Sequence, residues 1–330
     1  MPTYRRNEFD VSDRIDTTDY TQVEHEIFRL FRELYQRDPD PSLTLAFSDL
    51  VTLYWGEHPD YHACDTGYHD LQHVLDVTLT MARLMDGCRR ALNYSPLDER
   101  MYSLGVVAAL YHDVGYLRHV NDTRHTKGAE YTVTHVSRGV AFLKSYLSES
   151  GLPEEAGTAS RMLHFTGYEL PTDSIRIPPP FQVVGCLLGS ADILAQMADR
   201  CYLEKCHDRL YSEFVLGGIA RRRDGAGNEI IIFDSADDLV YKTAGFFRSA
   251  TKRLQQDLGG YSIYLDKYFG GDNLYLSEIE KNISYARQIS ESHDISLLRR
   301  VPPDTLVHDQ DNSPSAEGRP RIAWMPQAQA

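Results

Sequence analysis

Two histidines four residues apart stand in the most informative stretch of this sequence, YHDLQHVLDV at residues 68–77. On a helix, the rings of His69 and His73 lie on one face, one turn apart. An apolar stripe continues beside that face and consists of Val74, Val77, Met81, Leu84 and Met85. The spacing therefore predicts a partly buried helix that carries both imidazoles on one side.

Two other stretches place ionisable side chains in apolar helical segments. AALYHDVG at residues 108–115 puts His112 and Asp113 at the end of one segment, and GSADIL at residues 189–194 puts Asp192 inside another. Burying an imidazole or a carboxylate is costly unless a partner compensates it, and a divalent cation is an efficient partner. Nine of the 13 histidines lie between residues 58 and 164, more than an even spread would place there. Together these features indicate a metal site.

Most of the remaining chain has the apolar spacing of amphipathic helices. The segments with this spacing are residues 21–36, 42–55, 69–86, 98–113, 128–148, 154–165, 181–215, 236–258 and 274–290. Strand signals are confined to residues 219–233, where two short extended runs flank a turn that contains Asp and Gly. We predict an all-α multi-helix bundle with one small surface β-hairpin near residues 219–233.

No linker-like composition interrupts residues 20–295, which favours a single large domain. We expect a catalytic domain over residues 1–300, with an N-terminal helical extension over residues 1–40. Residues 301–330 are rich in Pro, Ser, Gln and Asp and are expected to form a flexible C-terminal tail, in which Trp324 is available for docking.

The composition excludes several classes of protein. Hydrophobic residues make up 42% of the chain and charged residues 25%, which is typical of a globular protein. The net charge of −14 disfavours binding to nucleic acid, and the short run Arg221-Arg222-Arg223 is typical of a solvated loop. The longest uncharged run, residues 177–191, is too short for a membrane helix, and the N-terminal segment does not resemble a signal peptide.

The five cysteines include no C-x-x-C pair, which fits reduced thiols better than a disulfide framework or a cysteine zinc site. We therefore expect a cytoplasmic protein that binds neither nucleic acid nor membranes. The sequence leaves open whether it forms a homo-oligomer.

The order His, His-Asp, Asp resembles the signature of the HD superfamily of metal-dependent phosphohydrolases. The form Y-H-x-x-x-H-x-x-D-V at residues 68–77 resembles the opening motif of the class I cyclic-nucleotide phosphodiesterases, and the resemblance covers about residues 65–260. It implies an HD/phosphodiesterase-like helical fold with His69 as the general acid. It also implies a set of metal ligands made of His73, His112, Asp113 and Asp192.

Further positions match this family less closely. HVSRG at residues 135–139 resembles the H-x-x-x-G segment whose His lies near a second metal, and His164 stands where other HD branches supply another ligand. Both residues are equally compatible with ordinary helix histidines. Phe246 matches the aromatic that clamps the purine in the phosphodiesterases, but Thr243 stands where their purine-reading glutamine would be.

Two more residues near these motifs differ from the family or have an open role. Where the phosphodiesterases continue with His-Pro-Gly after the His-Asp pair and two further residues, this chain has Tyr116. Tyr68 is expected either to line the pocket or to pack in the core.

The resemblance implies hydrolysis of a small phosphorylated substrate, a phosphodiester such as a cyclic nucleotide. Two divalent cations would hold it, with Zn, Fe or Mn in the first site and Mg or Mn in the second. A hydroxide shared by the two cations would attack phosphorus, and His69 would protonate the departing alkoxide. Asp70 or Glu130 is expected to orient a histidine ring nitrogen, and the sequence does not decide between them.

Three alternatives remain open at this point. HDLQH at residues 69–73 differs by one methylene from the H-E-x-x-H motif of zinc peptidases, although this leaves His112, Asp113 and Asp192 unexplained. Some HD proteins are oxygenases with mixed-valent di-iron, to which His135 and His164 would be suited. The third alternative is a regulatory module that binds metal without turning anything over.

Overall fold

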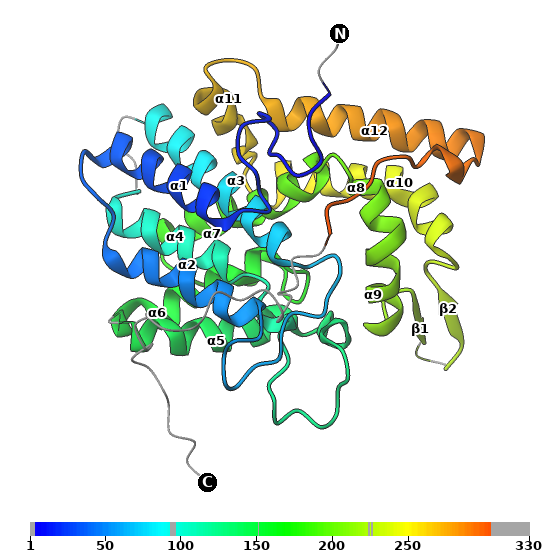
Figure 1. Cartoon of the computed structure of the whole chain (residues 1–330), viewed down its shortest axis with the longest axis horizontal. Helices are drawn as coiled ribbons and strands as arrows, with labels where there is room; N and C mark the ends of the chain where they lie inside the picture. Colours follow the sequence, from blue (N-terminus) through cyan, green and yellow to red (C-terminus); the bar gives the residue numbers. More distant parts are fainter. Residues whose placement is uncertain (1–3, 93–96, 151, 224, 226, 305–330) are drawn as a thin grey trace, which may run out of the picture.

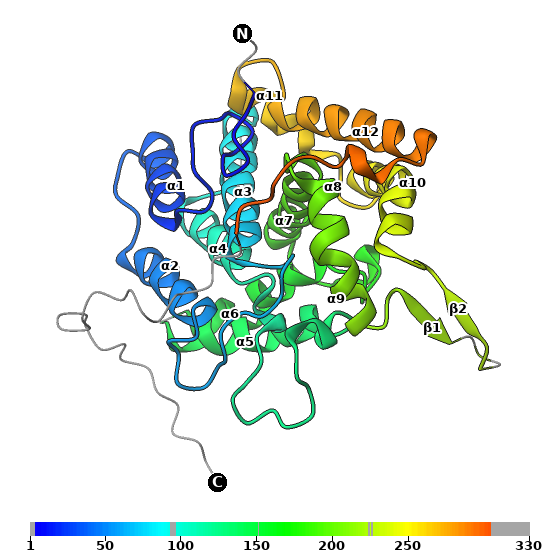
Figure 2. The same ribbon diagram turned by 45° about the vertical axis from the view of Figure 1, so that its right-hand side comes forward.

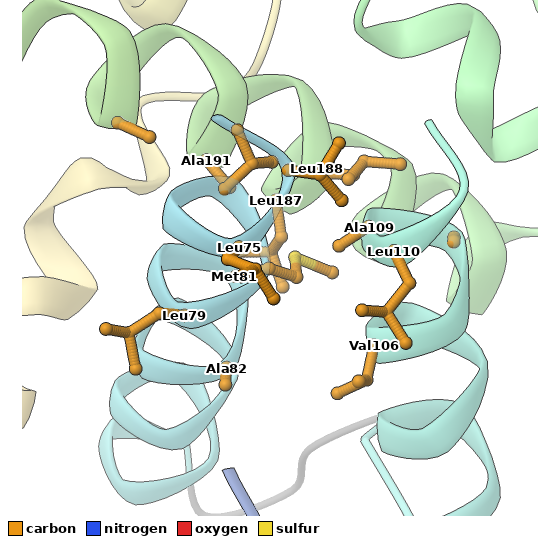
Figure 3. Close-up of a cluster of buried hydrophobic side chains, with 14 of the residues drawn as sticks. Leu75, Leu79, Met81, Ala82, Val106, Ala109, Leu110, Leu187, Leu188 and Ala191 are labelled. Carbon is orange, nitrogen blue, oxygen red and sulfur yellow. The ribbon is translucent and has the colours of Figure 1, made fainter. Parts of the chain in front are cut away.

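Helix α3 (Leu71–Ala91) lies at the centre of the molecule, where almost all of its side chains are buried (Figures 1 and 2). It packs against α1 (Tyr20–Tyr35), α4 (Glu99–Leu110), α7 (Pro179–Ala198) and α11 (Tyr264–Phe269). Figure 3 shows the core between three of these helices, built from Leu75, Leu79, Met81 and Ala82 of α3, Val106, Ala109 and Leu110 of α4, and Leu187, Leu188 and Ala191 of α7. These three helices also carry, or lead directly into, four of the predicted metal ligands, His73, His112, Asp113 and Asp192.

The computed structural model describes residues 4–92, 97–150, 152–223, 225 and 227–304. The other helices are α2 (Pro41–Tyr54), α5 (His135–Glu149), α6 (Pro153–Ala159), α8 (Tyr202–Lys205), α9 (Tyr211–Leu216), α10 (Ala236–Gln256) and α12 (Leu274–Ser292). Short 3₁₀ turns lie at Val114–Tyr116, Gly128–Tyr131, Ser160–Phe165, Thr172–Ser174, Tyr261–Ile263 and Ile295–Leu297, and a π-helical turn lies at Cys206–Leu210. The all-α prediction is therefore confirmed.

Strands β1 (Arg221–Arg223) and β2 (Glu229–Ile231) form the small hairpin predicted near residues 219–233. They pair antiparallel, with Arg221 opposite Ile231, and the hairpin projects from the body beside α9 (Figure 2). All three arginines of β1 are exposed to solvent. The predicted tail begins at residue 301, and its residues 305–330, including Trp324, lie outside the described residues.

Several predicted helix boundaries differ from the structure. The segment predicted as helical over residues 181–215 breaks after Ala198 and resumes as α8, the π-helical turn and α9. The segment predicted over residues 128–148 is helical only from His135, because residues 128–134 form a 3₁₀ turn and a loop. Helix α11 was missed because its six residues are too few to show a clear apolar period.

Helix α7 is longer than the uncharged run in the sequence suggested. It has 20 residues and is long and apolar enough to cross a membrane by length and composition alone. However, 67% of its most apolar window is buried inside the molecule, where it packs on α3, α4 and α12. Its apolar character is therefore explained by its place in the core of the described part of the chain.

The N-terminal segment before α1 is tied to α3 by a buried ion pair. Nη2 of Arg83 lies 2.6 Å from Oδ2 of Asp10, and both side chains are 2% exposed. Burial by itself would raise the pKa of Asp10, but the charge of Arg83 and hydrogen bonds from Ile15, Ser12 and Arg14 hold that pKa at about 2. The carboxylate is therefore more acidic in the folded than in the unfolded protein.

We expect Asp10→Asn to lower the free energy of unfolding at pH 7 by about 3 kcal/mol, because it leaves Arg83 buried without its counter-charge. In the parent protein the stabilisation by the ionised Asp10 is complete above the pKa of this residue in the unfolded chain, about 4. It is lost as the pH falls through the pKa of Asp10 in the folded protein, about 2. Urea denaturation between pH 2 and 7 measures it. The exposed Asp272→Asn is the control, and equal pH dependence in the two variants would contradict the assignment.

Candidate metal centre and active site

Helix α3 begins at Leu71 because Asp70 caps it. Oδ1 of Asp70 accepts a hydrogen bond of 3.0 Å from the backbone N–H of His73, which satisfies a donor in the first turn. His69 therefore lies on the turn before the helix and His73 within its first turn. The prediction that both histidines share one helix face is wrong, because the aspartate between them is a helix cap.

The His-Asp pair likewise lies beyond its predicted helix. Helix α4 ends at Leu110, and His112 and Asp113 lie in the turn that leads to the 3₁₀ turn Val114–Tyr116. Nδ1 of His112 lies 2.8 Å from the carbonyl oxygen of Ala109. Because a carbonyl can only accept, Nδ1 donates this hydrogen bond, and Nε2 of His112 is the nitrogen that faces His73 and Asp113.

Two glycines bring this turn against the start of α5. A Cβ atom at Gly115 would lie 1.8 Å from the carbonyl oxygen of His135. A Cβ atom at Gly139 would lie 3.4 Å from the carbonyl oxygen of His112 and 3.2 Å from the side chain of Leu163. The glycines that follow the His-Asp pair and His135 in the sequence therefore allow two segments of the site to approach closely.

We expect Gly115→Ala to lower the free energy of unfolding by about 3 kcal/mol, since a methyl group there overlaps backbone that cannot move independently. The matched control is Gly157→Ala in α6, where a Cβ meets nothing within 4 Å. That change is expected to be neutral or to stabilise by about 0.5–1 kcal/mol. Urea denaturation compares the two variants, and equal stabilities would contradict the close approach.

Four of the predicted ligands meet at one point. Nε2 of His73 lies 3.4 Å from Nε2 of His112, 3.4 Å from Oδ2 of Asp113 and 3.5 Å from Oδ1 of Asp192. Nε2 of His112 lies 3.2 Å from Oδ2 of Asp113. One donor atom each from His73, His112 and Asp192 lies within 4.8 Å of the others. Donor atoms that share one ion at about 2.0–2.2 Å lie roughly 3–3.5 Å apart, so the spacing fits a cation.

The electrostatics of the cluster also favour a positive charge at its centre. Oδ2 of Asp113 is buried and has no hydrogen-bond partner within the described residues. Burial by itself would lower the pKa of His73, but the carboxylates of Asp113 and Asp192 raise it to about 10. Burial would raise the pKa of Asp113, but His112 and His73 hold it well below its usual range. A divalent cation would compensate both carboxylates, and the donor set suits Zn, Fe or Mn.

Of the two additional candidate ligands, only His135 reaches this group. Its Nε2 lies 3.7 Å from Oδ1 of Asp113, and its Nδ1 lies 2.7 Å from the carbonyl oxygen of Thr132. Asp113 thus presents one oxygen to His73 and His112 and the other to His135. His164 lies in the 3₁₀ turn Ser160–Phe165 and is absent from the described residues that line the adjoining cavity.

His69 is oriented by a residue that the sequence did not identify. Its Nδ1 lies 2.6 Å from Oε2 of Glu213, whose Oε1 accepts a hydrogen bond of 2.6 Å from the backbone N–H of Tyr68. Burial by itself would lower the pKa of His69, but the charge and hydrogen bond of Glu213 raise it above its ordinary value. Glu213 is buried on α9 and is 144 residues away in the sequence.

The prediction that Asp70 or Glu130 orients a histidine ring is therefore wrong for His69. Asp70 caps α3, and Oε1 of Glu130 accepts from the backbone N–H groups of Thr126 and Lys127 at 2.6 and 2.9 Å. The only available signal for Glu213 in the sequence was its position directly before the apolar run FVL at residues 214–216.

A cavity of about 750 Å³ opens beside the cluster. His69, His73, Asp113, His135 and Asp192 line one end of it. The other walls are mainly apolar and include Ile193, Tyr202, Leu210, Phe214, Ile219, Phe233, Leu239 and Phe246. A small organic molecule fits a cavity of this size and character.

The three predicted substrate-contacting residues all line this cavity. Tyr68 lies beside His69 and His73, with ring centroids 5.1 and 5.9 Å away. Phe246 faces Tyr202 at 6.3 Å. The hydroxyl of Thr243 donates a 3.0 Å hydrogen bond to the carbonyl oxygen of Leu239 in its own helix. Thr243 therefore directs its donor to the backbone of its own helix.

No family model matches this chain, and no curated protein sequence matches it. Among solved structures, the chain is similar to the phosphodiesterase domain of the RhoPDE fusion protein from the choanoflagellate Salpingoeca rosetta. The two are 15% identical, the match covers 88% of this chain and 96% of the other, and the TM-score is 0.48.

Proposed function

We propose that this protein is a metal-dependent phosphohydrolase that cleaves a phosphodiester, with His69 as its general acid. The observation that carries the proposal is the position of His69. An imidazole held by a buried carboxylate lines the same end of the cavity as a cluster of two histidines and two aspartates. A proton donor beside a metal cluster is what protonation of a departing alkoxide requires.

Two sets of residues would hold the cations. His73, His112, Asp113 and Asp192 suit the first, and Asp113 with His135 would contribute to the second, since Asp113 faces both sides. When bound, such cations neutralise phosphoryl oxygens and lower the pKa of an attacking water. This charge also accounts for the binding of an anionic substrate by a protein with a net charge of −14.

The hydrogen bond to Glu213 determines which nitrogen of His69 delivers the proton. Because Nδ1 donates to the carboxylate, Nε2 is the nitrogen left to face a leaving group. The raised pKa favours the protonated ring that a general acid requires. Glu213 also holds the backbone of Tyr68, so that the turn carrying His69 is tied to α9 at two points.

The cavity walls indicate the class of substrate. The mainly apolar walls suit an aromatic or aliphatic ester group on a small phosphodiester, and a cyclic nucleotide is one such molecule. Phe246 would pack on a flat group of this kind. Thr243 offers a nucleobase less than a glutamine amide does, because its hydroxyl proton is already donated to Leu239.

The alternatives fit the site less well. A zinc peptidase would need His69 as a ligand on the same helix as His73, whereas His69 precedes the helix and pairs with Glu213. The oxygenase alternative requires both His135 and His164 as iron ligands, and of these two only His135 reaches Asp113. A regulatory metal module has no use for an oriented proton donor.

Elemental analysis of the purified protein, followed by assays with added Zn, Fe, Mn and Mg, tests the proposal. The substrates are cyclic mono- and dinucleotides, nucleotides and simple phosphodiesters such as bis(4-nitrophenyl) phosphate. We expect about two equivalents of metal and hydrolysis of at least one diester. Full metal occupancy without turnover of any ester would refute it, and an electron paramagnetic resonance signal of mixed-valent di-iron would support the oxygenase.

A further inference from the structure

Tyr116 connects the two halves of the site through its ring. The ring stacks on His69 with centroids 4.4 Å apart and an interplanar angle of 18°, and on His135 at 4.4 Å and 19°. The centroids of the two imidazoles lie 6.3 Å apart. Tyr116 is buried and lines the cavity. A single tyrosine therefore contacts the face of the proton donor and the face of the histidine beside Asp113.

The backbone on both sides of Tyr116 is held in place. Nε of Arg138 donates to the carbonyl oxygen of Gly115 at 2.7 Å, and Nη2 of Arg138 donates to that of Leu117 at 2.9 Å. The N–H of Tyr116 donates to the carbonyl oxygen of Asp113 at 3.0 Å. Arg138 lies one helical turn after His135 on α5, so the same helix supplies the clamp and one of the stacked rings.

Each stacked histidine needs a second constraint. Glu213 fixes Nδ1 of His69, and the carbonyl oxygen of Thr132 fixes Nδ1 of His135. A hydrogen bond at one nitrogen leaves a ring free to tilt about that nitrogen. Contact with an aromatic face opposes the tilt. Catalysis is sensitive to such a tilt, because a displacement of about 1 Å can cost about 10²-fold in rate.

We propose that Tyr116 is a positioning residue whose ring face aligns His69 with the reacting phosphodiester and holds His135 beside Asp113. This role rests on the proposed function. The role belongs to the ring face, so phenylalanine retains it and leucine, which is smaller and has no flat face, does not.

The test compares Tyr116→Leu and Tyr116→Phe with the parent protein on methyl 4-nitrophenyl phosphate and methyl phenyl phosphate. The nitrophenolate leaves without help, whereas the phenolate needs the proton of His69. For Tyr116→Leu we expect kcat on the phenyl ester to fall about 10- to 100-fold and on the nitrophenyl ester several-fold less. KM should stay within about threefold, and Tyr116→Phe should remain within about threefold on both esters.

The matched control is Tyr61→Leu. Tyr61 also lies between two histidines, 5.4 Å from His58 and from His119, but it does not line the cavity. This control should leave the ratio of the two rates unchanged. Proton NMR of histidine rings in chelator-treated protein gives a readout that does not depend on activity. The resonances of His69 and His135 should shift in Tyr116→Leu and keep their positions in Tyr116→Phe, while those of His293 should not move.

An unchanged rate ratio in Tyr116→Leu would overturn the proposal, and so would equal losses in the leucine and phenylalanine variants. If the parent protein cleaves neither these esters nor any in the wider panel, the proposed function fails as well. The NMR shifts distinguish the two failures, because they report whether the ring lies against the two histidines whatever the reaction is.

Discussion

Asp113→Ala is expected to lose both bound metal and activity, with kcat/KM at least about 10³-fold lower. Within the described part of the chain, Asp113 is the carboxylate that faces both groups of donors, with Oδ2 near His73 and His112 and Oδ1 near His135. Removing it takes away one of the two carboxylate charges that make the site attractive to a cation. Metal content measured on the purified variant, together with diesterase assays at saturating Zn and Mn, gives the result.

A second His-Asp pair in the chain, His207-Asp208, supplies the control. Asp208 also follows a histidine and lies 2.6 Å from the ring of His207, but it is exposed on the surface. Asp208→Ala should keep full metal content and activity. Asp113→Asn, which preserves shape and removes the charge, separates loss of a ligand from loss of packing. Normal metal content in both Asp113 variants would rule out the proposed centre.

His69→Ala is expected to lower kcat by about 10²–10⁴-fold while metal content stays near that of the parent protein. The reason is that His69 pairs with Glu213, outside the group formed by His73, His112 and Asp192. The loss should be greatest for esters with poor leaving groups and small for 4-nitrophenyl esters. Parallel metal analysis and assays with both kinds of ester provide the measurement.

Glu213→Gln refines this second result through its pH dependence. In the parent protein Glu213 raises the pKa of His69, so the protonated acid persists to higher pH. As the pH is raised, the activity of the glutamine variant should therefore begin to fall at a lower pH than that of the parent protein. His119→Ala, on a surface loop, serves as the control because His119 does not line the cavity. Metal loss in His69→Ala would contradict its role as an acid.

Local features of the sequence predicted much of the architecture. The apolar period of residues 21–36 and 236–258 predicted α1 and α10 closely, because an amphipathic helix is specified by neighbours three and four residues apart. The two extended runs around residues 224–228 predicted the hairpin for the same local reason. The ligand types were also readable, since imidazoles and carboxylates in apolar segments require compensation.

Local patterns were misleading where a polar side chain competed with the helix. Asp70 looked like part of a helical H-x-x-x-H motif, yet it caps α3 and leaves His69 outside. The same ambiguity affected His112 and Asp113, whose turn depends on the contact of Gly115 with His135. His164 had a spacing as suggestive as that of His135, but only the packing of α5 against the turn brings one of them to Asp113.

By itself, the sequence determined which kinds of side chain had to be buried together and along which helices. Only the tertiary structure decided that Glu213 orients His69, that Tyr116 stacks on two histidines, and that Asp113 faces donors on both sides. The physical reason is the separation in sequence over which each kind of interaction acts. Helix periodicity arises between residues a few positions apart, whereas an oriented proton donor needs groups 144 residues apart to meet within hydrogen-bond distance.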